Sequence, residues 1–101
     1  MDLELTTKRE GAELTVALNG ELNTMTATEL KALLDAELPN TETLFLDFAG
    51  CDFVSSAGLR VLLAAFKSLK AKKGTMELKN VGPTFSEVLD ITGLDTVFGR
   101  K

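Results

Sequence analysis

The 101-residue sequence contains no histidine. Histidine is the commonest general base in enzymes and the commonest ligand of transition metals, so its absence removes the usual candidates for both roles. A serine nucleophile would need a lysine or a carboxylate as its base, and no lysine or glutamate lies close in sequence to Ser56. We therefore expect no catalytic residue, no metal site and no cofactor.

Cysteine and long apolar runs are equally scarce. Cys51 is the only cysteine, so an intrachain disulfide is excluded, which fits a reducing compartment. The simplest interpretation of Cys51 is a small buried residue. No segment approaches the ~20 consecutive apolar residues that span a bilayer. Residues 1–4 lack the positive and apolar regions of a signal peptide. We expect a cytoplasmic protein without direct membrane insertion.

Positive charge is also in the minority. Fifteen acidic residues stand against 11 basic ones, which gives a formal net charge of −4 and argues against a nucleic-acid-binding surface. The chain is long enough to bury one modest hydrophobic core but not two, and no repeat, linker or low-complexity segment divides it. The sequence therefore predicts a single domain over residues 1–101.

The first half of the sequence predicts a hairpin and a helix. Apolar residues alternate with polar ones over residues 3–7 and 14–18, which is typical of two strands joined by a tight turn. Residues 19–20 (Asn-Gly) are expected to close the second strand. Thr26 and Glu29 have capping-box spacing, although Asn23 or Thr24 could equally cap the helix that follows. Apolar residues at helical spacing then extend to a stop at Pro39-Asn40, and they are Ala27, Leu30, Leu33, Leu34 and Leu38.

The second half predicts strand, helix, strand and helix. Residues 44–48 read as a buried strand that ends in a turn at 49–50, and apolar residues recur at helical spacing from 59 to 69. A short strand is expected at 75–79, and a helix with a capping box at Thr84 and Glu87 is expected to end at Gly93. Residues 94–98 form either a last strand or an apolar tail. The predicted fold is α/β, with a mixed sheet of four to five strands and helices packed against it.

Two serines, Ser55 and Ser56, fall where the central strand meets the long helix. A serine at this position can cap the helix by accepting a hydrogen bond from a first-turn N–H group. The partial positive charge of the same N–H groups favours an anion, so the junction also suits a phosphoserine. Spacing alone favours the capping role for Ser56, and Ser55 is interpreted as a cap or a turn residue.

Three stretches together resemble the STAS domain family, which is named for sulfate transporters and anti-sigma factor antagonists. They are residues 20–23 (GELN), 44–51 (LFLDFAGC) and 53–62 (FVSSAGLRVL), and the last is the most specific. The resemblance covers essentially the whole chain in length and element order. It is strongest to the small free-standing bacterial members of the family.

The resemblance implies a regulatory binding protein, an anti-sigma factor antagonist. Such antagonists bind an anti-sigma factor that is also a serine kinase of the histidine-kinase-like ATPase type. Phosphorylation of a serine at the strand–helix junction breaks that complex, and a serine phosphatase restores the unmodified form. Gly58 matches the glycine of the family's Ser-Gly-Leu or Thr-Gly-Leu element, which places the phosphoacceptor at Ser56 and puts Ala57 where a second hydroxyl residue stands. Free-standing members are usually monomers, which we also expect here.

Besides Ala57, this sequence departs from the family pattern at three further positions. Ser55 and Asn23 each stand where an aspartate is common, and both changes would reduce the repulsion of a phosphate while removing possible kinase contacts. Arg60 replaces a common glycine one helical turn beyond Ser56, where it could face a partner or a phosphate. The partner-binding surface that the resemblance implies consists of Asn23, Thr24, Met25, Phe53, Val54, Ser55, Ser56, Ala57, Gly58 and Arg60.

Several alternatives stand beside this interpretation. The chain could be the STAS subunit of a membrane lipid or anion transport complex that docks through the same junction. Gly58 could serve helix packing instead of partner approach. Asp47 ends an apolar strand as a receiver phosphoaspartate would, but the acidic pair that a receiver needs after its first strand is missing. The lysines of the long helix are expected on its solvated face, and they are Lys67, Lys70, Lys72 and Lys73.

Overall fold

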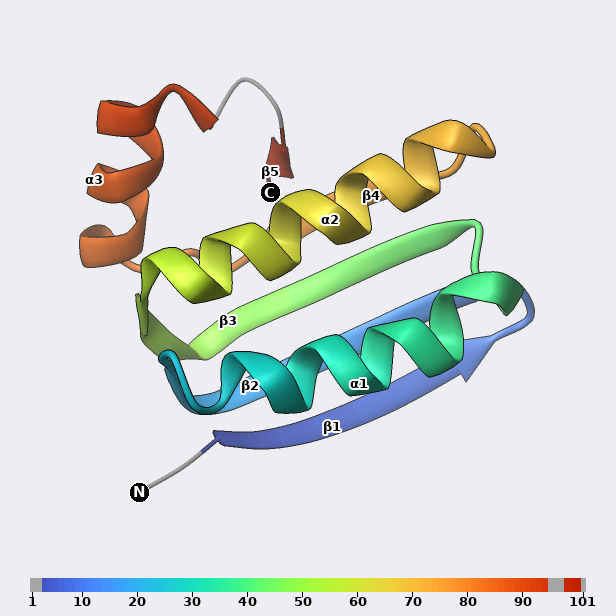
Figure 1. The fold of residues 1–101 in the computed structure, drawn as a ribbon, viewed down its shortest axis with the longest axis horizontal. Coiled ribbons are helices and arrows are strands. Elements are labelled where there is room, and N and C mark those ends of the chain that lie inside the picture. The colour runs from blue at the N-terminus through green and yellow to red at the C-terminus, as the bar shows by residue number, and fades with distance from the viewer. Residues whose placement is uncertain (1–2, 95–97, 101) are drawn as a thin grey trace.

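The computed structural model describes residues 3–94 and 98–100 (Figure 1). Strands and helices alternate after an initial hairpin, in the order that the sequence predicts. The elements are β1 (Leu3–Glu10), β2 (Glu13–Leu22), α1 (Ala27–Glu37), the short 3₁₀ helix η1 (Leu38–Asn40), β3 (Thr43–Val54), α2 (Ser56–Ala71), β4 (Thr75–Lys79), α3 (Pro83–Thr92) and β5 (Gly99–Arg100).

The strands form one mixed sheet in the order β1-β2-β3-β4-β5. β1 is antiparallel to β2, whereas β2 pairs with β3, β3 with β4 and β4 with β5 in parallel. The predicted α/β fold with four to five strands is confirmed. Because β2, β3 and β4 are parallel, their carboxyl ends lie at one edge of the sheet, where the loops leading into the helices gather.

The core lies between the sheet and the helices. α1 and α2 run side by side across one face of the sheet (Figure 1). Alternate residues of β2 and β3 are buried, which places their side chains in the core. Burying these apolar side chains stabilises the domain by about 25 cal/mol per Å² removed from water. The fully buried members include Leu14, Val16, Leu18, Leu44, Leu46, Phe48, Leu30, Leu34, Leu62 and Leu69.

The other face of the sheet carries mostly polar side chains. Asp47 Oδ1 there accepts hydrogen bonds from the Ala49 N–H and from Asn80 Nδ2, both at 2.9 Å. Lys79 Nζ lies 4.1 Å from the ring centroid of Phe45, so the lysine stem and ammonium group cover this half-buried aromatic ring. The alternation of apolar and polar residues thus assigns one face to the core.

Two predicted turns are wrong, because both strands run through them. β2 continues past Asn19 to Leu22, with register shifts at Asn19 and a φ of +126° at Gly20. β3 continues through Gly50, which pairs with Asn19, and a Cβ on Gly50 would lie 1.9 Å from Asn19 Oδ1. The glycines therefore permit a bulge and a close approach of two strands, not the ends of strands.

The predicted ends of the helices are confirmed more closely than their predicted caps. α1 ends at Glu37, and Pro39 follows within η1. Gly93 ends α3 in the left-handed conformation, with a φ of +76°. Lys67, Lys70, Lys72 and Lys73 are all exposed, as expected, and Lys72 Nζ also donates a hydrogen bond to the Leu38 carbonyl, which joins the end of α2 to η1.

The last predicted segment, residues 94–98, falls partly on residues 95–97, which lie outside the described part of the chain. Phe98 is buried and packs edge-on against Phe66, with ring centroids 5.9 Å apart. The short strand β5 follows at Gly99–Arg100 and pairs with β4.

A carboxylate from β3 caps the start of α3. Asp52 Oδ1 accepts a hydrogen bond from the Phe85 N–H at 3.0 Å, and Oδ2 accepts one from the Thr84 N–H at 3.3 Å. The capping box predicted for Thr84 and Glu87 is therefore wrong, because Gly82 precedes the helix and Asp52 takes the free N–H groups. The ring of Phe85 packs on Phe48 with centroids 4.9 Å apart, so this cap also fixes α3 against β3.

The Asp52 cap predicts a pH-dependent contribution to stability. The hydrogen bond from the Phe85 N–H is the main cause that holds the pKa of Asp52 below its usual value. A depressed folded-state pKa means that the stabilisation is fully present above the ordinary carboxyl pKa and is lost as the pH falls through the folded-state value. We expect Asp52→Asn to be less stable than the wild type at pH 7, and the gap to close as the pH falls below the ordinary carboxyl pKa and through the lower folded-state pKa.

Urea unfolding over this pH range measures the effect. Glu21→Gln is the matched control, because it removes a carboxylate from the same end of the sheet and its side chain makes no hydrogen bond with any described residue. A difference between wild type and Asp52→Asn that stays constant over the whole pH range would contradict this assignment.

Candidate functional site

The ends of β2 and β3 bring the two predicted site segments together. Leu22 pairs with Val54, and the Ser55 N–H donates a hydrogen bond to the Leu22 carbonyl at 2.8 Å. The loop before α1 and the first turn of α2 therefore leave the sheet next to each other, at the same end of the molecule (Figure 1). Residues about thirty positions apart in the sequence thus form one surface.

The loop before α1 is built around Asn23. Its Oδ1 accepts hydrogen bonds from the N–H groups of Met25 and Thr26, both at 2.9 Å. Thr26 Oγ1 accepts from the Asn23 N–H at 2.8 Å and donates to the Glu21 carbonyl at 2.6 Å. Thr26 is the N-cap of α1 but its side chain makes no capping hydrogen bond to the helix, so the predicted Thr26–Glu29 capping box is wrong. The Asn23 side chain instead closes the turn that precedes the helix. The closed loop leaves Thr24 and Met25 exposed.

Ser55 and Ser56 have different roles. Ser55 is the N-cap of α2, in an extended conformation, and its Oγ accepts a hydrogen bond from the Gly58 N–H at 3.2 Å. Ser56 is the first helical residue, and it is exposed. Its hydroxyl has no hydrogen-bond partner among the described residues. The alternative that Ser56 is the helix cap is therefore wrong, because Ser55 fills that role and leaves the Ser56 oxygen open to water.

Gly58 lies beneath this surface instead of on it. It is buried, and a Cβ at this position would lie 2.8 Å from Leu22 Cγ and 3.1 Å from Val54 Cγ1. Such distances are shorter than packed side chains tolerate, so a larger residue would push α2 away from the ends of β2 and β3. Gly58 thus has the packing role that the sequence left open, while Val54 and Ala57 are half-buried beside it.

Large apolar side chains are exposed at few places. Among residues 3–94 and Phe98 only three qualify: Met25 at 80%, Ile91 at 78% and Phe53 at 49% exposed. Met25 and Phe53 belong to the two adjacent segments described above, whereas Ile91 lies near the end of α3. Exposed apolar residues beside polar ones are typical of surfaces that bind another protein.

Negative charge is sparse around Ser56. The first turn of α2 contains no acidic residue. Asp52, four residues before Ser56, directs its carboxylate to the backbone of α3. The free N–H groups at the start of α2 carry partial positive charge, which stabilises an anion by about 0.3 to 1 kcal/mol at an exposed site. The surroundings of the Ser56 hydroxyl can therefore accept a phosphate group.

Neither a reactive thiol nor a metal site accompanies this surface. Cys51 is buried, its Sγ donates to the Phe53 carbonyl at 3.4 Å, and burial is the main cause that raises the pKa of the thiol. Within residues 3–94 and 98–100, no cluster of three potential metal ligands occurs. None of the described helices combines the length and apolar character that crossing a bilayer would require.

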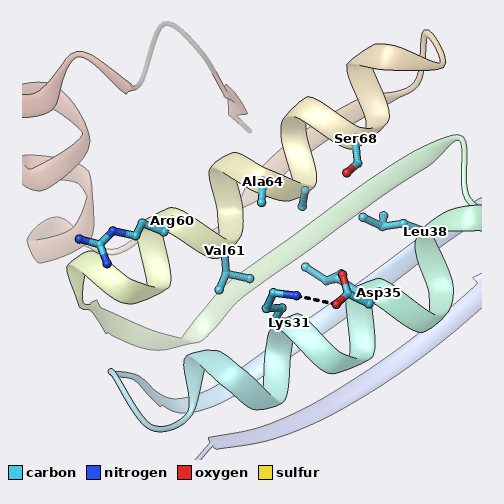
Figure 2. Close-up of a pocket in the computed structure, with 9 residues that line it drawn as sticks. Lys31, Asp35, Leu38, Arg60, Val61, Ala64 and Ser68 are labelled. Carbon is cyan, nitrogen blue, oxygen red and sulfur yellow. Dashed lines mark hydrogen bonds and ion pairs between the residues drawn. The ribbon is translucent and has the colours of Figure 1, made fainter.

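A groove of about 320 Å³ lies between α1 and α2 and adjoins the site (Figure 2). Lys31 and Asp35 form an ion pair across one turn of α1 at 2.7 Å, on one side of the groove. The small residues of α2 form the other side, and Arg60 stands where the groove approaches the start of α2. The lining residues are Lys31, Leu34, Asp35, Leu38, Arg60, Val61, Ala64, Ala65 and Ser68.

Sequence reasoning missed the groove and the Asp52 cap. The groove depends on how far apart two helices pack, and no local pattern encodes that distance. Asp52 and Thr84 are 32 positions apart, so no motif joins them. The capping signal that does exist in the sequence, Thr84 with Glu87, points to a different hydrogen-bond acceptor.

Comparison with known proteins relates the whole chain to one family. A family model described as "Mlab, STAS domain" matches residues 5–99. The protein BtrV of Bordetella bronchiseptica, which is provisionally named an anti-sigma factor antagonist, is 34% identical over 97 residues, covering 95% of this chain and 84% of that protein. An anti-sigma F factor antagonist of Paenibacillus polymyxa is 29% identical over 96 residues, covering 93% of this chain and 82% of that protein.

Solved structures share the fold at lower identity. The anti-sigma factor antagonist SpoIIAA in its unphosphorylated form has a TM-score of 0.86 at 21% identity, covering 97% of this chain and 88% of that chain. The Bacillus SpoIIAA in its phosphorylated form has a TM-score of 0.79 at 21% identity, covering 97% and 91%. The family model spans nearly the full length and the fold agrees with it, so the chain belongs to the STAS domain family.

Proposed function

We propose that this protein is an anti-sigma factor antagonist whose binding is switched by phosphorylation of Ser56. One observation carries the proposal: the Ser56 hydroxyl is exposed at the first residue of α2, while the neighbouring Ser55 supplies the cap. Relatives with 34% and 29% identity bear the name of anti-sigma factor antagonists. SpoIIAA, which shares the fold, exists in phosphorylated and unphosphorylated forms.

The unmodified protein binds its partner through the surface around Ser56. Met25 and Phe53 supply the exposed apolar area, and apolar and aromatic anchors of this kind contribute most of the binding energy at protein interfaces. Thr24, Ser56 and Arg60 provide polar groups around them. We propose that the partner is an anti-sigma factor that is also a serine kinase of the histidine-kinase-like ATPase type. The antagonist acts as a monomer in the cytoplasm, by binding and not by catalysis.

Phosphorylation adds charge at the centre of this surface. The kinase transfers the γ-phosphoryl group of ATP to the Ser56 oxygen, the hydroxyl proton is released, and ADP leaves. The new group carries about −1.5 to −2 charges at neutral pH. Within the domain the group lies in water beside the positive end of α2, but in the complex it must lose its water. A penalty of about 4 kcal/mol would weaken binding about a thousandfold. A serine phosphatase then removes the phosphate and restores binding.

The modification itself is the first test. Incubation with the kinase-like partner and ATP, followed by mass spectrometry, is expected to place one phosphate on Ser56. Ser56→Ala should abolish the modification, while Ser55→Ala, which removes the cap and costs about 1 kcal/mol of stability, should still be modified. The phosphorylated protein should bind the partner about a thousandfold more weakly than the unmodified one. Equal affinity of the two forms would refute the switch, and binding to a permease or transport ATPase instead would favour the transport-complex alternative.

The apolar anchors give a second, independent prediction. Phe53→Ala is expected to weaken binding of the unmodified protein to the kinase-like partner by at least about tenfold, since truncating an interface anchor commonly costs more than 1 kcal/mol. Ile91→Ala is the control, because it removes an apolar side chain that is more exposed than Phe53, at 78% against 49%, but lies on α3. Calorimetric titration measures both affinities. An equal effect of the two substitutions would mean that the partner does not bind at Phe53.

A further inference from the structure

Arg60 is the cation nearest in sequence to Ser56, and it lies on the same helix. The two residues are four positions apart in α2, and both are exposed. Side chains at this spacing share one face of a helix, with Cβ atoms about 5–6 Å apart. Helical side chains also lean towards the N-terminus of their helix. Figure 2 shows the Arg60 guanidinium directed towards the start of α2, the turn that contains Ser56.

The guanidinium of Arg60 is not engaged elsewhere. Within residues 3–94 and 98–100 it makes no hydrogen bond and no ion pair. The acidic residue that shares the groove with it, Asp35, is already paired with Lys31 at 2.7 Å. Asp52, the acidic residue closest in sequence before Ser56, accepts the N–H groups of α3. Because these carboxylates have partners, an anion on Ser56 would meet little competition for Arg60.

We propose that, once Ser56 carries a phosphate, Arg60 of the same chain binds that phosphate. Guanidinium groups suit this contact because their planar N–H donors match two phosphate oxygens at once. The contact forms within one turn of α2, so it requires a change of side-chain rotamers and no movement of the backbone. The inference rests on the proposed function in that it takes Ser56 as the modified residue.

The contact gives phosphorylation a second effect on the binding surface. In the unmodified protein the Arg60 guanidinium is free to meet an acidic group of the partner. In the phosphorylated protein the guanidinium is held by the phosphate, so the surface loses a cation as well as gaining an anion. A phosphate held in this way is also less accessible to a phosphatase, which prolongs the released state.

The contact can be tested without a kinase or any other partner. Phosphoserine is incorporated at position 56 during synthesis of the full chain, and the second ionisation of the phosphate is followed by ³¹P NMR. This ionisation normally has a pKa of about 6, and a bound cation lowers that pKa because it favours the dianion. The pKa in the otherwise unchanged chain is expected to be lower than in the Arg60→Gln variant by about 0.3 unit, the order of effect of an exposed i,i+4 charge pair.

Two further variants separate a specific contact from general charge. Arg60→Lys keeps the charge but loses the planar fork, so it should give an intermediate pKa. Lys67→Gln removes an equally exposed cation from the same helix, 11 positions from Ser56, and should leave the phosphate pKa unchanged. The arginine Nε–H signal of Arg60 should also shift as the phosphate becomes a dianion.

Equal phosphate pKa values with and without Arg60, or an equal change on removing Lys67, would overturn the proposal. That result would leave the assignment of Ser56 as phosphoacceptor intact, because the assignment is measured by mapping the phosphate that a kinase adds. Conversely, a kinase that fails to modify Ser56 would refute the proposed function and would not change the titration result.

Discussion

The hydrogen bond from the Ser55 N–H to the Leu22 carbonyl, 2.8 Å long, is the contact on which the geometry of the site depends. It extends the pairing of β2 and β3 by one residue beyond the sheet, and thereby fixes where α2 begins. Gly58 lets the first turn of α2 approach Leu22 closely enough for this bond to persist. The start of α2 is thus a rigid part of the fold, so a group attached there has a defined position before any partner arrives.

The same constraint gives the two adjacent serines different roles. Ser55 faces inward, caps α2 and stabilises the fold, whereas Ser56 faces water and makes no contribution to capping. A residue that stabilises the helix cannot be modified without a structural cost, but its neighbour can. Since Arg60 and the free N–H groups lie near Ser56, and the Asp52 carboxylate is held by α3, we expect the domain to tolerate an anion that a partner surface would have to desolvate.

Most of the fold follows from local patterns in the sequence, while the details of the site follow from contacts between distant residues. Alternation and helical spacing predicted the hairpin, the later strands and the helices, because burying one face requires such periodicity. Glycine was misread as a turn at Gly20 and Gly50, where it serves a bulge and a close strand contact. The motif around Ser56 predicts the candidate site, but the Asp52 cap could not be predicted because its partners follow 32 and 33 positions later.

We propose that phosphorylation changes the charge of a preformed surface and leaves the backbone where it is. Amide hydrogen exchange and backbone NMR shifts of the unmodified protein and of the protein with phosphoserine at 56 test it most directly. Changes should be confined to residues 23–26 and 52–60, with the exchange of core amides in β2 and β3 unaltered. Altered exchange throughout the sheet, or shifts that extend along α3, would show that the modification refolds the domain and would contradict the claim.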